Sequence, residues 1–348
     1  MAMRHLLCLV MAAGPWWISC RAFSSTGSGA GGYWSMTCVS GDGRYLLAGG
    51  DHAALVDAST GAVVERVPKM VKAVGCDQGG GVIVGYDTAF RLPGRAAVPV
   101  PPLGGDGALA MSPEGAWISS GRSTAGGKWK GPAMVFVTHG QDRRRFDLMP
   151  ERFGLVGAAR PLPFPDSFAV RFGSLLQDGR LLVAAGWQPS RNAGTVEDLP
   201  WAFFAWDLKT NEASPLTGPV HSDRAINQAW VQRIAATPDA AHLVIATHDG
   251  ERLSIGRFER DANRASRVVS LASNGGPSAL ALSNDGTLVA VGSESRGREA
   301  PAQAWLLDSA GRVVWNASFE KRVAGIHFLP DGSLIVAAGE GRAVKVTP

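Results

Sequence analysis

Aspartate and histidine side chains beside apolar segments are the residues of this sequence that could bind a metal ion. Asp51, Asp87 and Asp249 each follow an apolar segment, whereas His327 lies within one. Carboxylates and imidazoles bind divalent cations when several converge. The seven histidines are scattered rather than placed at ligand spacing. We therefore predict loop-capping aspartates and a packed histidine, and no catalytic, metal or cofactor residue; a metal site is the alternative.

Known catalytic and metal-binding motifs are absent from the sequence, and the one nucleotide-binding pattern lacks the strand and helix that it requires. The stretch "GSGAGG" from Gly27 fits G-x-G-x-x-G, but dinucleotide binding requires a strand before it and a helix after it. No G-x-S-x-G, H-E-x-x-H or C-x-x-C pattern occurs. The spacing of reactive residues therefore predicts no reaction.

Tryptophan, arginine and lysine side chains gather in long insertions between apolar segments. These are the residue types that dominate protein-binding hot spots. The residues that we predict to contact a partner are Lys128, Trp129, Lys130, Trp187, Arg191, Trp201, Arg224, Trp230, Arg296 and Arg298. Two alternatives are loops that pack on themselves and a small-molecule pocket at a channel mouth.

A repeated unit must position these insertions. "SALALSNDGTLVAVGSES" from Ser278, "MTCVSGDGRYLLAGGDH" from Met36 and "GIHFLPDGSLIVAAGEG" from Gly325 share an apolar run, a polar turn and a second apolar run. Apolar runs bounded by turn residues predict β-strands. The first strands of the units are expected at 36–40, 72–76, 108–112, 169–176, 233–237, 279–283 and 325–329.

Four strands per unit, repeated about seven times, predict an all-β fold, a seven-bladed β-propeller of four-stranded antiparallel blades spanning residues 33–348. The inner strands are apolar at consecutive positions because each blade is covered on both sides by its neighbours. Composition agrees, since 44 glycines and 21 prolines suit short strands and tight turns.

Strand order places the insertions on one face of the ring. Connections from the second to the third strand and from the fourth strand to the next blade share a face, and the recurrent Asp-Gly turns lie on the other. The insertions at 122–132, 150–165, 187–200, 217–228 and 294–302 all belong to the first set. We therefore predict one elaborated face and one plain face.

The units resemble the WD-repeat family. "VQRIAATPDAAHLVIATHDGERLSIGRF" and "FFAWDLKTN" carry that resemblance best, and Trp206-Asp207 is the one literal WD pair. "VDASTGAVVERV" and "LLDSAGRVVW" are similar to the quinoprotein repeat. The resemblance implies a ring closed by a strand from the other terminus, for which residues 21–25 or 33–35 are candidates.

The first twenty residues, "MAMRHLLCLVMAAGPWWISC", are expected to be a signal peptide. Their end resembles a bacterial lipoprotein signal, which implies lipidation of Cys20, although Trp17 departs from the usual small or branched residue. Ordinary secretory cleavage and a chain that is not exported are the alternatives. Residues 21–32 have the Gly/Ser composition of a tether.

Cys38 and Cys76 occupy corresponding places in neighbouring units. Packed sheets lie roughly 10 Å apart, beyond the ~7 Å limit on the Cα separation of a disulfide. We therefore expect two buried free thiols.

A net charge of +4 without long basic runs argues against a nucleic-acid partner. We predict a monomeric, non-enzymatic module of the bacterial cell envelope that faces the periplasm, takes no cofactor and binds a protein. It is similar to propeller lipoproteins of the outer membrane and serves as a scaffold or as an immunity protein that neutralises a toxin. The alternative is an enzyme with a central-channel site, either a metal-dependent hydrolase such as a lactonase or a quinone-dependent dehydrogenase.

Overall fold

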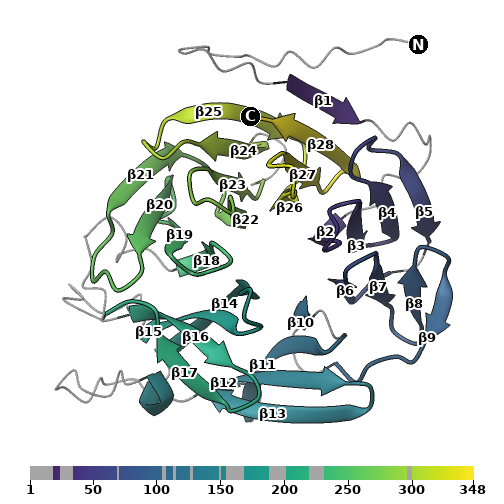
Figure 1. The fold of residues 1–348 in the computed structure, drawn as a ribbon, viewed down its shortest axis with the longest axis horizontal. Helices are drawn as coiled ribbons and strands as arrows, with labels where there is room; N and C mark the ends of the chain where they lie inside the picture. Colours follow the sequence, from purple (N-terminus) through teal and green to yellow (C-terminus); the bar gives the residue numbers. More distant parts are fainter. Residues whose placement is uncertain are drawn as a thin grey trace.

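The computed structural model describes residues 19–23, 34–68, 70–103, 107–112, 115–125, 128–148, 150–153, 168–187, 201–218, 231–295 and 300–348. These residues form seven four-stranded antiparallel sheets arranged around a common axis (Figure 1). The predicted seven-bladed β-propeller is confirmed.

The first four blades follow the chain from the inner strand outwards. Blade 1 comprises β2 (Trp34–Val39), β3 (Tyr45–Gly50), β4 (Ala53–Asp57) and β5 (Val63–Val67). Blade 2 comprises β6 (Ala73–Cys76), β7 (Gly81–Val84), β8 (Ala89–Leu92) and β9 (Ala96–Val98). Blade 3 comprises β10 (Gly107–Met111), β11 (Trp117–Ala125), β12 (Lys128–His139) and β13 (Asp142–Leu148). After the 3₁₀ helix η1 (Pro150–Phe153), blade 4 comprises β14 (Phe168–Leu175), β15 (Leu181–Trp187), β16 (Trp201–Asp207) and β17 (Glu212–Pro215).

The last three blades repeat this order, and the seventh is completed by the N-terminal strand. Blade 5 comprises β18 (Val231–Ala236), β19 (His242–His248), β20 (Arg252–Glu259) and β21 (Arg267–Ala272). Blade 6 comprises β22 (Pro277–Leu282), β23 (Val289–Ser293), β24 (Ala302–Leu307) and β25 (Val313–Phe319). Blade 7 comprises β26 (Val323–Phe328), β27 (Leu334–Ala338), β28 (Arg342–Thr347) and, outermost, β1 (Ser19–Phe23).

Hydrophobic clusters in the described residues lie between blades rather than within them. On β3, Leu46 faces blade 7 whereas the adjacent Leu47 faces blade 2. One such cluster joins each pair of neighbours, including blades 7 and 1. Both faces of a blade are thus buried only when the ring is complete, which explains why the inner strands are apolar at consecutive positions.

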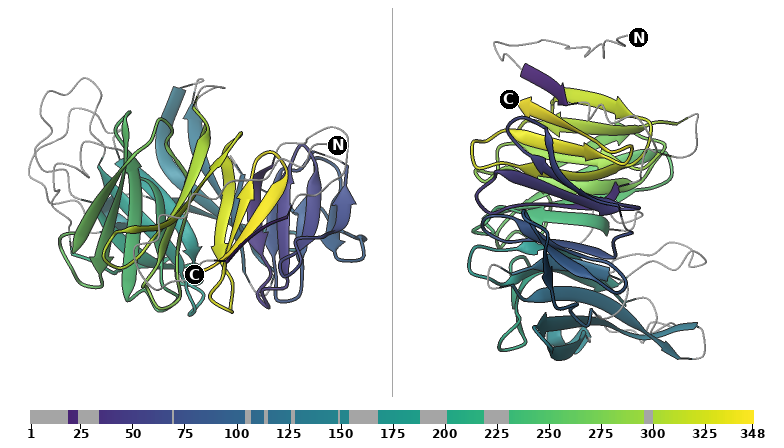
Figure 2. Two further views of the ribbon diagram at one scale, coloured as in Figure 1. Left: turned by 90° about the horizontal axis from the view of Figure 1, so that it is seen from above. Right: turned by 90° about the vertical axis from the view of Figure 1, so that its right-hand side faces the viewer.

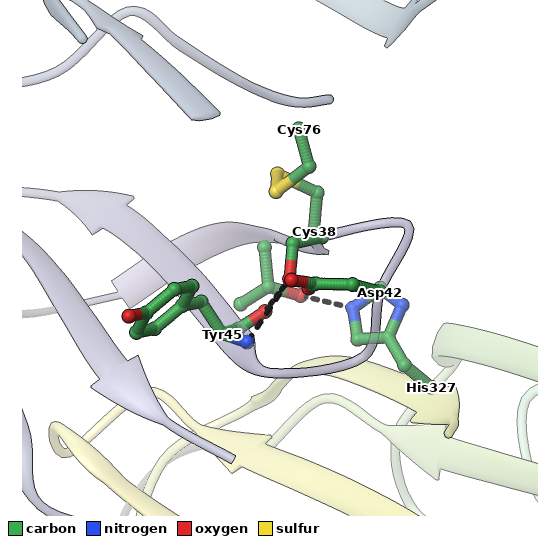
Figure 3. Close-up of a disulfide and its surroundings, with 7 residues drawn as sticks. Cys38, Asp42, Tyr45, Cys76 and His327 are labelled. Atoms are coloured by element: carbon green, nitrogen blue, oxygen red, sulfur yellow. Dashed lines mark hydrogen bonds between the residues drawn. A yellow bond between two sulfur atoms is a disulfide. The ribbon is translucent and has the colours of Figure 1, made fainter. Parts of the chain in front are cut away.

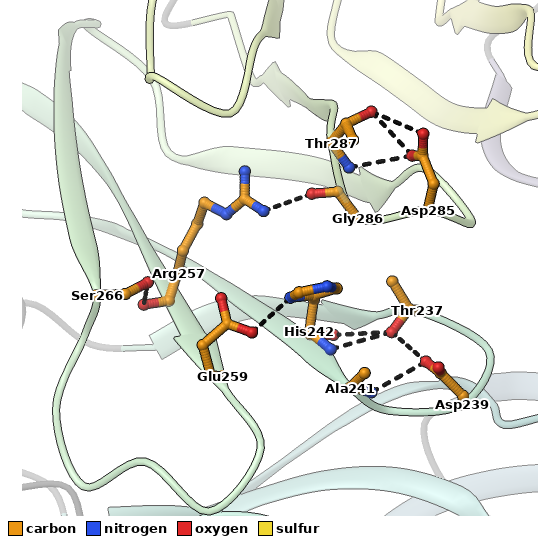
Figure 4. Close-up of polar contacts among 10 residues, drawn as sticks. All are labelled: Thr237, Asp239, Ala241, His242, Arg257, Glu259, Ser266, Asp285, Gly286 and Thr287. Atoms are coloured by element: carbon orange, nitrogen blue, oxygen red, sulfur yellow. Dashed lines mark hydrogen bonds and ion pairs between the residues drawn. The ribbon is translucent and has the colours of Figure 1, made fainter.

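Aspartate side chains fix the hairpin turns between the first and second strands. In blade 5 the Thr237 hydroxyl donates to Asp239 Oδ1 at 2.6 Å and accepts the backbone N–H of His242 at 3.0 Å (Figure 4). The hydrogen bond from Thr237 lowers the pKa of the Asp239 carboxyl group. Ser40 with Asp42 and Ser283 with Asp285 repeat this arrangement. The Ser/Thr-x-Asp sequence motif therefore specifies the turn.

The ring is closed by β1, which pairs antiparallel with β28 from Ser19↔Thr347 to Phe23↔Ala343. Figure 1 shows the two strands side by side at the rim. β1 overlaps the first of the two predicted closing segments. It also takes in the last two residues assigned to the signal peptide and the first three assigned to the tether, so the blades extend beyond the predicted boundary at residue 33.

The prediction of two free thiols is wrong, because Cys38 and Cys76 form a disulfide with a Cα–Cα distance of 5.8 Å (Figure 3). The spacing of roughly 10 Å applies to sheets separated by layers of side chains. Near the axis the blades converge, and their inner strands approach more closely. Gly41 N–H donates to the Asp77 carbonyl at 2.8 Å, so the backbones of blades 1 and 2 touch directly beside the disulfide.

Candidate functional site

The two faces of the ring differ as predicted in their connections. We call the face that carries the second-to-third and fourth-to-first connections the long-loop face, and the opposite one the plain face. On the long-loop face, β15 ends at Trp187 and β16 begins at Trp201, and β17 ends at Pro215 before β18 begins at Val231. The plain face carries the short aspartate-capped turns.

The insertion predicted at 122–132 continues β11 and β12 as a hairpin. Thr124 pairs with Trp129, and Ala125 pairs with Lys128. Lys128, Trp129 and Lys130 therefore lie at the start of β12 rather than in an irregular loop. In the left view of Figure 2 the hairpin extends beyond the neighbouring strands at one face of the ring.

The prediction that Trp201 contacts a partner is wrong. It begins β16, but its side chain is only 6% exposed and packs edge-on against Phe203 and Phe258 between blades 4 and 5. A tryptophan that begins a strand after a long insertion has the same sequence signature whether it turns outward or inward.

Of the remaining predicted partner-binding residues, the structure describes only Trp187. Trp187 ends β15, where its backbone pairs with Phe168. Outside the described residues lie Arg191, Arg224, Trp230, Arg296 and Arg298.

An exposed apolar and aromatic group on the long-loop face was not predicted. Met70 is 55% exposed and Tyr86 is 65% exposed. The Lys72 ammonium lies 3.9 Å from the centroid of the Tyr86 ring, which is a cation–π contact. Met70 and Lys72 precede β6 and Tyr86 follows β7, so two separate connections supply the group. No local sequence pattern predicts that residues from two separate connections come together.

A second group of charged residues lies where the inner strands of blades 5 to 7 begin. Arg233 is on β18, Glu294 follows β23 and Arg322 precedes β26. Arg233 and Glu294 are both exposed to solvent. Loss of hydration by the surrounding protein, and then the positive charge of Arg322, lower the pKa of Arg233, whereas the Glu294 carboxylate raises it. The Arg322 Nε atom is buried without a hydrogen-bond partner.

His327 lies on the inner strand β26, as predicted, and is half-buried. Its Nε2 atom is 2.7 Å from Oγ1 of Thr37 on β2, which links blades 7 and 1 across the closure of the ring (Figure 3). Burial lowers the pKa of this imidazole to about 4. Gly325 leaves room for the contact, because a Cβ atom there would lie 1.6 Å from Thr37 Oγ1.

We expect the free energy of unfolding to fall by about 2 kcal/mol as the pH drops from about 6.5 to about 4. The unfolded chain binds a proton at His327 near pH 6.5, whereas the folded chain resists it until about pH 4, so acid favours unfolding in this window. The full shift corresponds to about 3 kcal/mol, and solvent at the half-buried ring reduces it. Urea unfolding at a series of pH values measures the slope.

The variant His327→Gln should remove most of this pH dependence of the free energy of unfolding. Burial also lowers the pKa of His52, so His52→Gln should flatten the same window separately. The aspartates of the turns have lowered pKa values and lose their contribution only at more acidic pH. An unchanged slope in His327→Gln would contradict this assignment.

Aspartates considered as metal ligands cap turns where the structure resolves their contacts. Asp249 Oδ1 accepts the backbone N–H groups of Glu251 at 3.0 Å and Arg252 at 2.8 Å. Within the described ranges, no group of three or more His, Cys, Asp or Glu residues is placed to hold a metal ion. Likewise, no helix in those ranges has the length and apolarity to cross a membrane.

Comparison with known proteins supports the fold. No family model matches the sequence, and no curated protein matches it. The β-propeller domain of Myceliophteria thermophila Cps50 (Swd1) is similar with a TM-score of 0.56 and 12% identity, covering 94% of this chain and 98% of that one. Kuenenia stuttgartiensis hydrazine synthase is similar with a TM-score of 0.56 and 14% identity over 92% and 97% of the two chains. The Dos1 propeller aligns with a TM-score of 0.48 and 10% identity over 94% of each chain.

Proposed function

We propose that this chain is an exported, lipid-anchored, non-enzymatic propeller that holds a protein partner against its long-loop face. The observation that carries the proposal is the difference between the faces. Met70 and Tyr86 are exposed on the long-loop face, and the β11–β12 hairpin projects there. The plain face instead carries turns whose polar groups bond to one another. Exposed aromatic and sulfur-containing side chains are typical of protein-binding surfaces.

The disulfide between Cys38 and Cys76 supports export. Disulfides persist in oxidising compartments such as the bacterial periplasm and are rare in the cytosol of mesophiles. A periplasmic location agrees with the signal-like composition of the first twenty residues.

The place of Cys20 supports an anchor that leaves the long-loop face free. Cys20 pairs with Val346 near the end of β28, and this end of the strand lies at the plain face. A lipid on Cys20 would therefore bring the plain-face rim to the membrane and direct the long-loop face away from it. Cleavage before Cys20 would leave residues 20–23 available to pair with β28.

The proposed partner is a protein of the cell envelope. The two versions are a scaffold for envelope proteins and an immunity protein that covers the active site of a toxin in the periplasm. In both versions the propeller acts as a monomer without a cofactor and without nucleic acid, and rigid blades position the contact residues.

Site-directed photo-cross-linking in the native host tests this proposal. A photoreactive amino acid at Tyr86 should yield adducts with one partner protein, whereas the same residue at Arg264 should not. Arg264 is exposed on the connection between β20 and β21, which lies on the plain face. Adducts formed only from Arg264, or equally from both positions, would refute the assignment of the face.

A substitution series then measures the contribution of the exposed group. The double variant Met70→Ser and Tyr86→Ala should weaken partner binding at least about tenfold, as expected for truncation of a hot-spot aromatic residue. Val313→Ser is the matched control, because Val313 is 43% exposed on the outer strand β25. Equal losses in the two variants would show that the effect is not specific to the long-loop face.

A further inference from the structure

The charged residues Arg233, Glu294 and Arg322 lie near β-bulges that recur in the inner strands of blades 5 to 7. The register of the first strand pair shifts between Val231 and Arg233, between Pro277 and Ala279 and between Val323 and Gly325. Such bulges leave one residue unpaired and redirect the side chains around it. The bulges lie at the ends of the inner strands nearest the long-loop face.

Side chains at these bulges reach the neighbouring blades. Arg233 Nε donates to the Ser278 carbonyl at 2.9 Å, and Ser278 Oγ donates to the Val323 carbonyl at 2.7 Å. The Gln232 amide oxygen lies against Gly276, where a Cβ atom would approach it to 2.6 Å. Gly276 in turn accepts the backbone N–H of Glu294 at 2.9 Å. The three blades thus form one connected polar site.

Among the described residues of this site, positive charges outnumber negative ones. Arg233 and Arg322 carry guanidinium groups, and the positive charge of Arg322 acts on Arg233, whereas Glu294 carries the one carboxylate that opposes it. Arg233 donates to the neutral carbonyl oxygens of Ser278 and Gln232, and Arg322 Nε is buried without a hydrogen-bond partner. A buried donor without a hydrogen-bond partner costs free energy, and a ligand that accepts its hydrogen would recover that cost.

We propose that Arg233 and Arg322 form a carboxylate-binding subsite that receives an acidic side chain of the protein partner. This inference rests on the proposed function, because Arg233 and Arg322 lie at the ends of inner strands nearest the long-loop face. Guanidinium groups bind carboxylates through paired, charge-assisted hydrogen bonds. A carboxylate presents two coplanar oxygen atoms, which match the two N–H groups of a guanidinium fork. The two arginines therefore favour an acidic protein segment.

Thermal unfolding in the presence of glutarate tests the subsite without the partner. At constant ionic strength maintained with chloride, glutarate should raise Tm by about 2 °C, because a ligand that binds only the folded state stabilises it. The neutral analogue glutaramide should have no effect. The variants Arg322→Gln and Arg233→Gln should each lose the glutarate response, whereas Arg264→Gln on the plain face should retain it.

The stability of the unliganded variants separates a binding role from a structural one. Removing one of two like charges should leave Tm unchanged or raise it in Arg322→Gln, whereas loss of a structural ion pair would lower it. If Arg322→Gln fails to fold, Arg322→Lys keeps the charge but removes the guanidinium fork, and its glutarate response should be weaker. An equal glutarate response in wild type and both Gln variants, or none in the wild type, would overturn the proposal.

Two further outcomes separate this inference from the proposed function. Partner binding that is lost in the Met70 and Tyr86 double variant but unaffected in Arg322→Gln would leave the proposed function standing and refute the subsite as a partner contact. A glutarate response combined with no protein adduct from Tyr86 in the cross-linking experiment would leave a small-anion site and refute the proposed function. A larger response to phosphate than to glutarate would overturn the carboxylate assignment.

Discussion

Replacing Cys38 and Cys76 together with alanine should lower the free energy of unfolding by about 3 to 4 kcal/mol. The disulfide closes a loop with a sequence separation of 38 residues. In the chain-entropy model, a closed loop of this length restricts the unfolded chain by roughly that amount at 25 °C. The disulfide also joins the inner strands of blades 1 and 2, which are next to one another in the ring.

Urea unfolding under oxidising conditions measures the difference, and the reduced wild type serves as an internal comparison. Reduced wild type and the double variant should unfold at similar urea concentrations, and reductant should not affect the variant. A double variant as stable as the oxidised wild type would mean that the inner strands are held together by blade packing alone.

The fold could be predicted from the sequence because its determinants are local and repeated. In each unit the apolar runs specify strands, and a turn such as Ser283-Asn284-Asp285-Gly286 specifies the hairpin through contacts within five residues. Gly286 has a φ of 71°, a conformation that glycine adopts without strain. Seven repetitions of one such unit leave few alternatives to a closed ring.

The disulfide and the candidate site depend on geometry that no single unit contains. Cys38 and Cys76 are close because wedge-shaped blades converge at the axis. Tyr86 and Lys72 meet from two connections. Arg233 on blade 5 contacts Ser278 on blade 6, and Ser278 contacts Val323, the residue after Arg322, on blade 7. The sequence predicts which face carries the long connections, but ranking residues by type included the buried Trp201 among the expected partner contacts.

A chain that begins at residue 34 should be less stable by about 2 to 3 kcal/mol than one that begins at residue 19. The shorter chain lacks β1, so the five residue pairs between β1 and β28 are lost. Cross-strand pairs contribute up to about 1 kcal/mol each. The loss also leaves the backbone of β28 as an unpaired sheet edge, which can pair with another chain.

Thermal unfolding and sedimentation of the two chains test the closure directly, because they differ only in residues 19–33. The chain that begins at Ser19 should remain monomeric, whereas the chain that begins at Trp34 should unfold at a lower temperature and self-associate with increasing concentration. A synthetic peptide of sequence SCRAF, the sequence of β1, should partly restore the stability of the shorter chain because it supplies the missing strand. Equal stability of the two chains would contradict closure by β1. It would instead favour a tether that begins directly after Cys20, with blade 7 complete as three strands.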